Sequence, residues 1–170
     1  MLNPKALIEK AKTSKFYLRA LNFGLSRLIP FNRPHGIKIL KVEDNQIKTI
    51  LPFRGNNLNH IRGLHACALA TISEFTTGLL LLNKLDPNVY RIILQHLEMD
   101  YHYQGKTDAT ATYELSDEWL QEHVLQPLQI QDSIVIECQV KVHDIENNHL
   151  ATGKIHWQIK FWNKVKTKLN

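Results

Sequence analysis

The sequence predicts an α+β fold in which one long central helix is wrapped by a curved antiparallel sheet and preceded by an amphipathic helix. Residues 62–83 form a helical pattern that is too apolar for an ordinary amphipathic helix, so other elements must cover most of its surface. Two strand-like segments precede this helix and four follow it, and a sheet built from such strands is the simplest cover. At 170 residues the chain is long enough for one such domain.

The first half of the chain contains the amphipathic helix and a hairpin. Leucine and alanine recur at helical intervals over residues 4–28, and Pro30 ends the pattern. Residues 36–42 and 46–53 are apolar stretches on either side of a short turn-forming run of Glu, Asp and Asn. We therefore expect a β-hairpin between the leading helix and the central helix.

The second half alternates apolar and polar residues, which is typical of strands with one solvent-exposed face. Over 91–103 most of the odd positions are apolar, whereas His96 and His102 occupy even positions and should line a surface. Ser116 is the expected N-cap of a short helix that ends near Pro127. Two asparagines at 147 and 148 predict a turn. The four strands are expected at 91–103, 106–114, 133–143 and 155–161.

These patterns divide the chain into three parts. We expect a helical extension over residues 1–34, the main domain over residues 35–163, and a basic tail over residues 164–170. The leading helix could cover the mouth of a binding tunnel, lie on a membrane, or pack on the sheet.

The composition narrows the class of protein. Cys67 and Cys138 lack disulfide and metal-site spacings, which favours reduced thiols in a cytoplasmic protein. The sequence contains no run of 18 apolar residues, so it predicts no membrane span. The N-terminus lacks the apolar centre and the cleavage site of a signal peptide. The net charge of +5 fits a solvated surface, or weak attraction to anionic lipid, an acyl carrier or nucleic acid. No nucleic-acid-binding motif is present, so we expect no nucleic-acid partner.

One carboxylate, Glu74, lies inside the apolar central helix. On a helical wheel the bulky opposite face should contact the sheet, whereas small or weakly polar residues flank Glu74. The bulky face contains Leu69, Ile72, Thr76, Leu79 and Leu80, and the flanking residues are Cys67, Ala70, Thr71, Thr77 and Gly78. Small neighbours leave room for another group to approach the carboxylate.

Two kinds of group could fill this room. A second subunit could pack there, with Glu74 paired with Lys or Arg or accepting hydrogen bonds. Alternatively, a substrate could bind, because a carboxylate in a partly dry site has a raised pKa and can act as base or nucleophile. The start of the same helix offers unpaired backbone N–H groups that can stabilise an oxyanion. An acid and an oxyanion site are what acyl transfer to water requires.

The run Asn59, Gly63, His65 and Glu74 resembles the motif of hotdog-fold acyl-CoA thioesterases of the phenylacetate and 4-hydroxybenzoate type. In that motif Asn or Gln is followed six residues later by His-Gly-Gly, and Asp or Glu stands nine residues after the His. The order of helices and strands from about residue 36 to residue 162 is similar to that fold. The leading helix and the run NHIRGLHA resemble more closely an uncharacterised bacterial branch of the hotdog superfamily whose members carry the name thioesterase.

The resemblance implies a role for each matching residue. Glu74 matches the catalytic acid, which either attacks the thioester carbon or activates a water molecule. Ala66 matches the first Gly after the His, whose backbone N–H polarises the thioester carbonyl. Asn59 matches the side chain that orients the water or the acid, and His65 matches a position that mainly shapes the start of the helix.

The resemblance also implies partners. In such proteins the acid of one subunit works with the helix start of another, so we expect a homodimer or a dimer of dimers. The implied substrate is an acyl-CoA or acyl-carrier thioester, and neither a cofactor nor a metal is implied. We place Gly63, Cys67, Thr77 and Gly78 beside the bound substrate, together with His65. Gly78 occupies the family's polar position one turn after the acid.

Three other interpretations stay open. A dimer of this fold could bind acyl chains or an acyl carrier without cleaving them. A hydratase of the same fold would have an Asp and a His five residues apart before its long helix, whereas Asp144 and His149 have that spacing only in the late hairpin. His60 and His65 could contribute to a metal site, but they do not share a helix face and no third ligand has suitable spacing.

Overall fold

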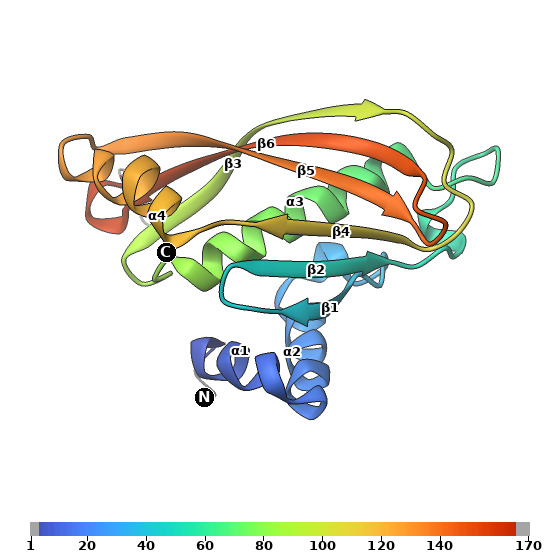
Figure 1. Ribbon diagram of the computed structural model, residues 1–170, viewed down its shortest axis with the longest axis horizontal. Coiled ribbons are helices and arrows are strands. Elements are labelled where there is room, and N and C mark those ends of the chain that lie inside the picture. The colour runs from blue at the N-terminus through green and yellow to red at the C-terminus, as the bar shows by residue number, and fades with distance from the viewer. Residues whose placement is uncertain (1–3, 166–170) are drawn as a thin grey trace.

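The computed structural model describes residues 4–165 and shows a six-stranded antiparallel sheet with a long helix against one face (Figure 1). The helices are α1 (Pro4–Thr13), α2 (Lys15–Leu28), α3 (Ala66–Lys84) and α4 (Asp117–Leu120), and a short 3-10 turn, η1 (Pro30–Asn32), follows α2. The strands are β1 (Lys38–Val42), β2 (Gln46–Leu51), β3 (Tyr90–Tyr101), β4 (Ala109–Glu114), β5 (Ser133–Asp144) and β6 (His149–Phe161). Their order in the sheet is β1-β2-β4-β5-β6-β3. This arrangement confirms the predicted fold.

The predicted hairpins and their core faces are confirmed. Strands β1 and β2 pair around the expected turn, and β5 pairs with β6 around Asn147, whose positive φ of 66° is one that Asn tolerates in a turn. The expected core face of β5 is buried throughout: Ile134, Ile136, Cys138, Val140 and Val142. Ser116 caps α4 by accepting a hydrogen bond from the Trp119 backbone N–H at 3.1 Å.

The prediction of one leading helix over residues 4–28 is wrong. The chain breaks at Ser14, which has an extended conformation, so that α1 and α2 are separate helices. The break lets Ile8 and Ala11 of α1 join Leu21 of α2 in the core, because the two helices pack against each other instead of continuing along one axis. The predicted basic tail falls mostly outside the described residues.

The central helix begins later than predicted. It starts at Ala66 rather than Arg62, because Arg62 has a left-handed backbone conformation with φ of 58°, which a helix cannot contain. Leu58 and Leu64 form an isolated antiparallel bridge that closes the loop before the helix. The four residues before α3 therefore belong to this loop.

Strand β3 differs from the prediction of one dry face. Its consecutive residues Ile93 and Leu94 are 44% and 39% exposed, so both faces of the strand reach solvent. The pairing register with β6 shifts between Leu94 and His96, which interrupts the strict alternation. Among the strands of residues 4–165, β3 lies at the edge of the sheet and pairs only with β6.

The two edge strands of the sheet differ in whether other residues bond to their outer backbone groups. At the β1 edge the Asn22 side chain of α2 donates to the Ile39 carbonyl oxygen at 3.0 Å and accepts from the Ile39 backbone N–H at 2.7 Å. Helix α2 thus satisfies backbone groups that an unpaired edge exposes. Strand β3 has no such cover within the described residues, so its outer backbone groups are open to a further strand.

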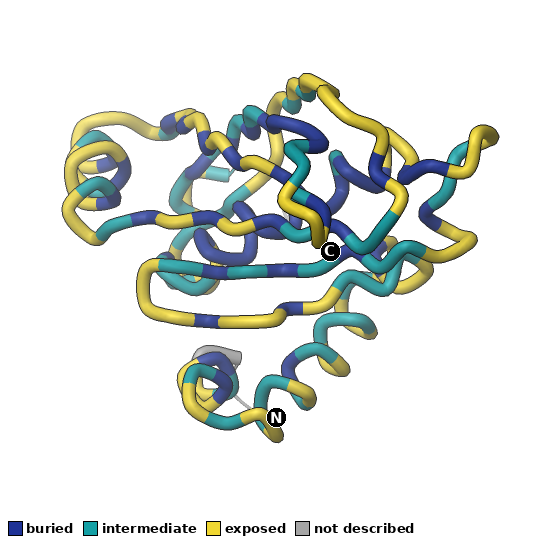
Figure 2. The backbone as a smooth tube through the Cα atoms, turned by 45° about the vertical axis from the view of Figure 1, so that its right-hand side comes forward, coloured by how far each residue is buried: buried dark blue, intermediate teal, exposed yellow. Residues whose placement is uncertain are grey.

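Helix α3 is mostly buried, whereas α2 is mostly exposed or partly exposed (Figure 2). Ile72, Thr76 and Leu80 of α3 are completely buried on the side of the sheet, and the Thr76 hydroxyl lies 2.6 Å from the Thr49 hydroxyl of β2. By length and composition alone α3 could cross a membrane, but 61% of its apolar window is buried inside the fold. It is the core helix of this domain.

Candidate active site

The loop before α3 is built around Asn59. Its side-chain oxygen accepts hydrogen bonds from the backbone N–H groups of Ile61 and Gly63, at 3.1 and 3.0 Å. Gly63 is buried, and a Cβ added there would lie 2.7 Å from the Gln104 side chain. Within this chain both residues therefore shape the loop, and neither contributes to the groove described below. Asn59 was expected to orient water or the acid, but its oxygen is used by the loop.

The start of α3 is fixed by His65. Its ring nitrogen Nδ1 accepts a hydrogen bond from the Cys67 backbone N–H at 3.0 Å, so His65 is the N-cap of the helix. Its own backbone N–H donates to the carbonyl oxygen of Asn57 at 2.8 Å. Asn57 is completely buried and donates to the carbonyl oxygens of Pro52 and His35. The predicted role of His65 in shaping the helix start matches these contacts.

Ala66 occupies the first position of the helix and is exposed. No residue within 4–165 accepts a hydrogen bond from its backbone N–H. Its carbonyl oxygen accepts a hydrogen bond from the Tyr101 hydroxyl at 3.1 Å, which ties the end of β3 to the helix start. The amide that the sequence predicts as an oxyanion donor is thus available to a ligand.

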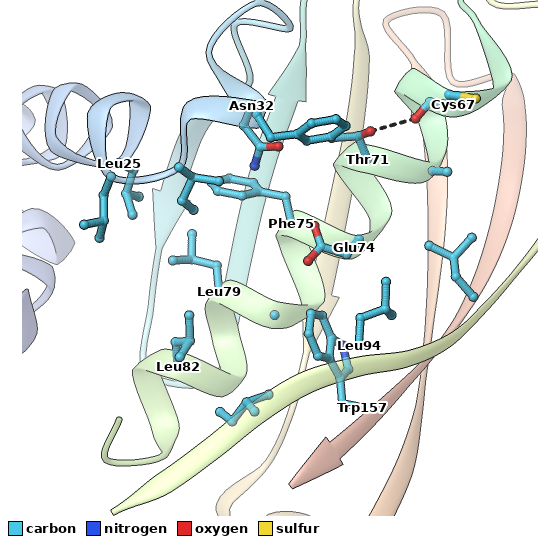
Figure 3. A pocket seen from close by; sticks show the side chains of 17 residues that line it. Leu25, Asn32, Cys67, Thr71, Glu74, Phe75, Leu79, Leu82, Leu94 and Trp157 are labelled. Atoms are coloured by element: carbon cyan, nitrogen blue, oxygen red, sulfur yellow. Dashed lines mark hydrogen bonds between the residues drawn. The ribbon is translucent and has the colours of Figure 1, made fainter. Parts of the chain in front are cut away.

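A groove of about 660 Å³ lies along the side of α3 that carries Glu74 (Figure 3). Its volume falls within the range of roughly 300–1,000 Å³ that is common for small-molecule sites. Its walls come from α2 and η1 on one side and from β3 and β6 on the other. The lining is almost entirely apolar and includes Leu25, Ile29, Phe75, Leu79, Leu82, Ile92, Leu97 and Trp157.

Among the described residues, Glu74 is the only carboxylic acid that lines this groove. Its carboxylate has no hydrogen-bond or ion-pair partner among the described residues, and Figure 3 shows it among the lining side chains. Burial raises the pKa of this carboxyl above its usual range, because the apolar surroundings disfavour the charged form. A half-buried, unpaired carboxylate that faces a cavity is suited to abstract a proton or to attack a carbonyl carbon.

The other residues predicted on the Glu74 face divide into two groups. Cys67, Ala70, Thr71 and Gly78 line the groove as expected, and the Thr71 hydroxyl donates to the Cys67 carbonyl oxygen at 2.7 Å. Thr77 does not line the groove.

Thr77 is completely buried, and its hydroxyl accepts a hydrogen bond from the Trp157 indole N–H at 3.0 Å. The expectation that Leu79 faces only the sheet is also wrong, because Leu79 and its neighbour Phe75 line the groove. A helix that packs at an angle to curved strands turns a different side toward the groove at each turn. A helical wheel assumes one constant direction and therefore misplaces such residues.

Sequence reasoning missed the wall formed by α2 and η1. This wall consists of residues from the last turns and the end of α2 and from η1. They are Leu25, Leu28, Ile29, Phe31 and Asn32. The leucines were visible as an apolar stripe of the leading helix, but nothing in the sequence indicated which element they would face. Of the roles left open for this helix, covering the binding groove and packing on the sheet edge are both observed.

The hydratase and metal-site interpretations receive no support from the described residues. Asp144 is used by the β5–β6 turn, where its carboxylate accepts hydrogen bonds from the backbone N–H groups of Glu146 and Asn148. The His149 ring lies against the His102 ring and 3.0 Å from the Thr152 hydroxyl. Among residues 4–165 no group of three His, Cys, Asp or Glu side chains is placed to hold a metal ion.

Comparison with known proteins decides the family. The model of the family described as "Domain of unknown function (DUF4442)" matches residues 18–159, which is most of the chain. The chain belongs to the DUF4442 family. No curated protein matches the DUF4442 chain in sequence.

Solved structures resemble this DUF4442 protein in fold. A Pseudomonas aeruginosa protein of unknown function, described as a probable thioesterase, has a TM-score of 0.76 and 20% identity over 84% of this chain and 95% of that one. A Haemophilus influenzae thioesterase has a TM-score of 0.66 and 14% identity over 89% and 95% of the two chains. These neighbours confirm the hotdog fold of the chain.

A Staphylococcus aureus thioesterase has a TM-score of 0.62 and 15% identity over 77% of this chain and 98% of that one. Its structures were solved with a Gln replaced by Ala and with a Glu replaced by Ala, and these two positions stand fifteen residues apart. Asn59 and Glu74 stand the same fifteen residues apart in this chain.

Proposed function

We propose that the protein hydrolyses an acyl thioester, with Glu74 as the acidic catalytic residue. The observation that carries this proposal is the unpaired Glu74 carboxylate on the wall of an otherwise apolar groove. In the reaction, water adds to the thioester carbon and the carbon–sulfur bond breaks, which releases a carboxylic acid and a thiol. Glu74 either takes the proton from the attacking water or attacks the carbon first to form an anhydride that water then hydrolyses.

The solved thioesterases support this chemistry by their fold and by the spacing of two residues. Hotdog-fold neighbours with thioesterase names span most of the chain. The fifteen-residue spacing of the altered Gln and Glu in the Staphylococcus aureus enzyme equals that of Asn59 and Glu74. We therefore assign Asn59 to the same site, where it orients the reacting groups through the loop that it holds.

The oxyanion donor must come from a second protomer. Ala66 and Glu74 lie eight residues apart on one straight helix, which corresponds to about 12 Å along the helix axis. A thioester carbonyl must lie roughly 3 Å from both the donor and the attacking group. One protomer cannot meet both conditions, so the Ala66 N–H of one protomer acts with Glu74 of its partner.

Strand β3 is the surface that we assign to this homodimer. It is a 12-residue edge strand with no neighbour on its outer side among the described residues, and such an edge can pair with the same strand of a second copy. Leu94 and Leu97 of β3 also line the groove. Pairing at this edge therefore brings the second protomer next to Glu74.

The substrate class follows from the lining of the groove. Apolar side chains on every wall favour an acyl chain over a polar or charged acid. The thiol portion, coenzyme A or an acyl carrier, leaves along the exposed start of the partner's α3. We propose a cytoplasmic enzyme, since both cysteines are free and Cys138 is buried as a thiol.

The test of the proposal is hydrolysis of a panel of acyl-CoA thioesters by wild type and by Glu74→Gln. We expect kcat to fall by at least about 100-fold in the variant, while its melting temperature stays the same or rises because the carboxylate has no partner to lose. A variant that remains fully active would contradict the assignment of Glu74. A variant that loses stability by several kcal/mol would instead indicate a buried ion pair across the dimer.

A mixing experiment tests the shared site. Ala66→Pro removes the amide donor at the first helical position, where proline is well tolerated, and the extended backbone of His65 suits a residue before proline. Alone, Ala66→Pro and Glu74→Gln should each be inactive, whereas Ala66→Gly keeps the donor and serves as control.

In mixed dimers one site of two has both an intact acid and an intact donor. Random exchange should therefore restore about a quarter of wild-type activity if the two groups come from different protomers. Absence of recovery, with mixed dimers demonstrated by a tag on one variant, would place both groups in one protomer or exclude the donor role.

Binding without cleavage is the second candidate function. It is favoured by Ala66, whose methyl group crowds the approach to the donor relative to glycine, and by Gly78, which places no polar side chain one turn after the acid. In that case purified protein retains acyl chains and hydrolyses no member of the panel. Native mass spectrometry of the purified dimer separates the two functions.

A further inference from the structure

The exposed side of α2 and η1 carries large apolar residues that nothing in the described chain covers. Phe16, Phe23, Leu28 and Phe31 are 72%, 60%, 76% and 69% exposed. Elsewhere within residues 4–165 comparable exposure occurs at Ile61, Tyr103, Ile130 and Ile145, and no two of these residues share a helix or strand. A concentration of exposed apolar side chains of this kind marks a surface that binds something. We call this surface the α2–η1 face.

The α2–η1 face is also strongly basic. From Lys10 to Val42 the sequence contains eight Lys or Arg residues and no Asp or Glu. Residues 1–34 carry a formal charge of +6, whereas the rest of the chain carries −1. The net positive charge of the protein therefore comes from the segment that contains this face.

The cations of the face are free to bind anions. Lys15, Arg19, Arg27 and Arg33 are exposed and form no ion pair with any residue in the described part of the chain. Arg19 and Arg27 share the outer side of α2 with Phe16 and Phe23, and the Arg27 guanidinium lies over the Phe23 ring at 4.3 Å. Basic and aromatic side chains thus alternate on one side of one helix.

The groove lies on the other side of the same segment. Leu28 and Phe31 are both highly exposed and part of the groove lining. The apolar side chains of the α2–η1 face are therefore continuous with the lining of the groove at the end of α2.

We propose that the α2–η1 face binds the surface of an anionic lipid bilayer, with Phe16, Phe23, Leu28 and Phe31 inserted among the lipids and the groove opening toward the bilayer. Exposed aromatic and aliphatic side chains together with Lys and Arg are the composition of helices that lie in the interface of anionic membranes. An acyl chain could then pass between the bilayer and the groove. This interaction does not depend on whether the protein cleaves thioesters.

A second copy of the chain is a less suitable occupant of this face. An isologous contact centred on α2 would bring two segments of charge +6 together, which the like charges oppose. Strand β3 is a better self-association surface, because it needs no charge neutralisation. Membrane phospholipids supply both the negative charge and the apolar interior that the α2–η1 face requires.

The test is flotation of the full-length protein with vesicles. We expect binding to vesicles of equal parts phosphatidylcholine and phosphatidylglycerol, and little binding to pure phosphatidylcholine vesicles. Raising NaCl from about 0.05 M to about 0.5 M should weaken the binding, because salt screens the charges. Absence of binding to the anionic vesicles at low salt would overturn the proposal.

Two pairs of substitutions identify the face. Phe16→Ser with Phe23→Ser should weaken vesicle binding by about tenfold or more, and Arg19→Gln with Arg27→Gln should weaken it by about fivefold for each charge removed. All four side chains are exposed, so the variants should fold as wild type does. Matched controls on other surfaces are Ile130→Ser with Ile145→Ser and Lys106→Gln with Lys141→Gln, which should bind as wild type.

Three results would contradict this assignment. Equal loss in the control variants would mean that binding is nonspecific, and unchanged binding in the face variants would place the lipid contact elsewhere. If the Phe variants instead convert a larger oligomer to a smaller one, measured by analytical ultracentrifugation, the face binds a second copy of the chain.

Discussion

Helix α3 has two faces with opposite properties. The face toward the sheet contains Ile72, Thr76 and Leu80, which are completely buried and contact side chains of the strands. The face toward the groove contains Glu74, whose carboxylate has no partner in the described chain, and small residues that leave a cavity. One helix therefore stabilises the core on one side and presents the candidate catalytic acid on the other. Substitutions on the two faces should therefore separate stability from activity.

The largest expected effect on stability is on the sheet face. Leu80→Ala should lower the free energy of unfolding by about 2–5 kcal/mol, because it leaves a cavity in a completely buried site. Chemical denaturation measures this loss, and turnover per folded molecule should not change. Leu82→Ala is the control on the same helix. It is 40% exposed, so its cost should be about 1 kcal/mol or less. Equal costs at the two positions would contradict the distinction between the faces.

Gly78 lies where the groove face meets the sheet. A Cβ added there would lie 2.7 Å from the Trp157 ring, whose N–H is held by Thr77. Gly78→Ala should therefore cost about 1–3 kcal/mol from overpacking, although alanine is the better helix former. It should also raise KM, because the displaced ring narrows the groove. In α2, Gly24 has no atom within 4 Å of an added Cβ, so Gly24→Ala should instead stabilise the protein by up to about 1 kcal/mol. Thermal melts of both variants provide the comparison.

The groove face should make stability depend on pH. Burial raises the pKa of Glu74 in the folded state, so the folded protein holds the proton more tightly than the unfolded chain does. The contribution of Glu74 to the free energy of unfolding is therefore complete below the ordinary pKa of Glu. It is lost as the pH rises through the raised pKa of the folded state. Each unit of difference in pKa corresponds to about 1.4 kcal/mol.

Wild type should therefore lose stability relative to Glu74→Gln as pH rises from acid toward neutral. Denaturant unfolding of both proteins across this range measures the difference. A difference that is constant with pH, or that grows in favour of wild type, would mean that a cation stabilises the carboxylate.

The smallest expected effect concerns the hydroxyl pair of the sheet face. Thr76→Val removes one of two buried hydroxyl groups 2.6 Å apart and leaves that of Thr49 without this partner, at a cost of about 1 kcal/mol. Removing both hydroxyls, by Thr49→Val with Thr76→Val, should cost less than the sum of the single changes. A double-mutant cycle measured by denaturation tests this, and additive costs would show that the two hydroxyls do not interact.

The central features of the site could be predicted from residue types and spacing. Glu74 was identifiable as an acid within an apolar helix, because helical periodicity is a local property of the chain, whereas Ala66 was indicated by the resemblance to the thioesterase motif. The faces of β5 and the turn at Asn147 were predictable for the same reason. Each depends on interactions between residues close in sequence.

Other features depended on packing between distant segments. The sequence did not indicate that Thr77 bonds to Trp157, eighty residues away, rather than facing the groove. Nor did it reveal that α2 protects the β1 edge through Asn22, or that β3 stays open and exposes both faces.

Local periodicity and composition were sufficient to predict a central helix with one acid, a set of antiparallel strands and a net positive charge. The folded structure was needed to show that α2 and η1 form a wall of the groove, and that the Glu74 carboxylate faces the cavity with no partner among the described residues. The physical reason is that the angle and register at which helices meet a curved sheet are set by long-range packing.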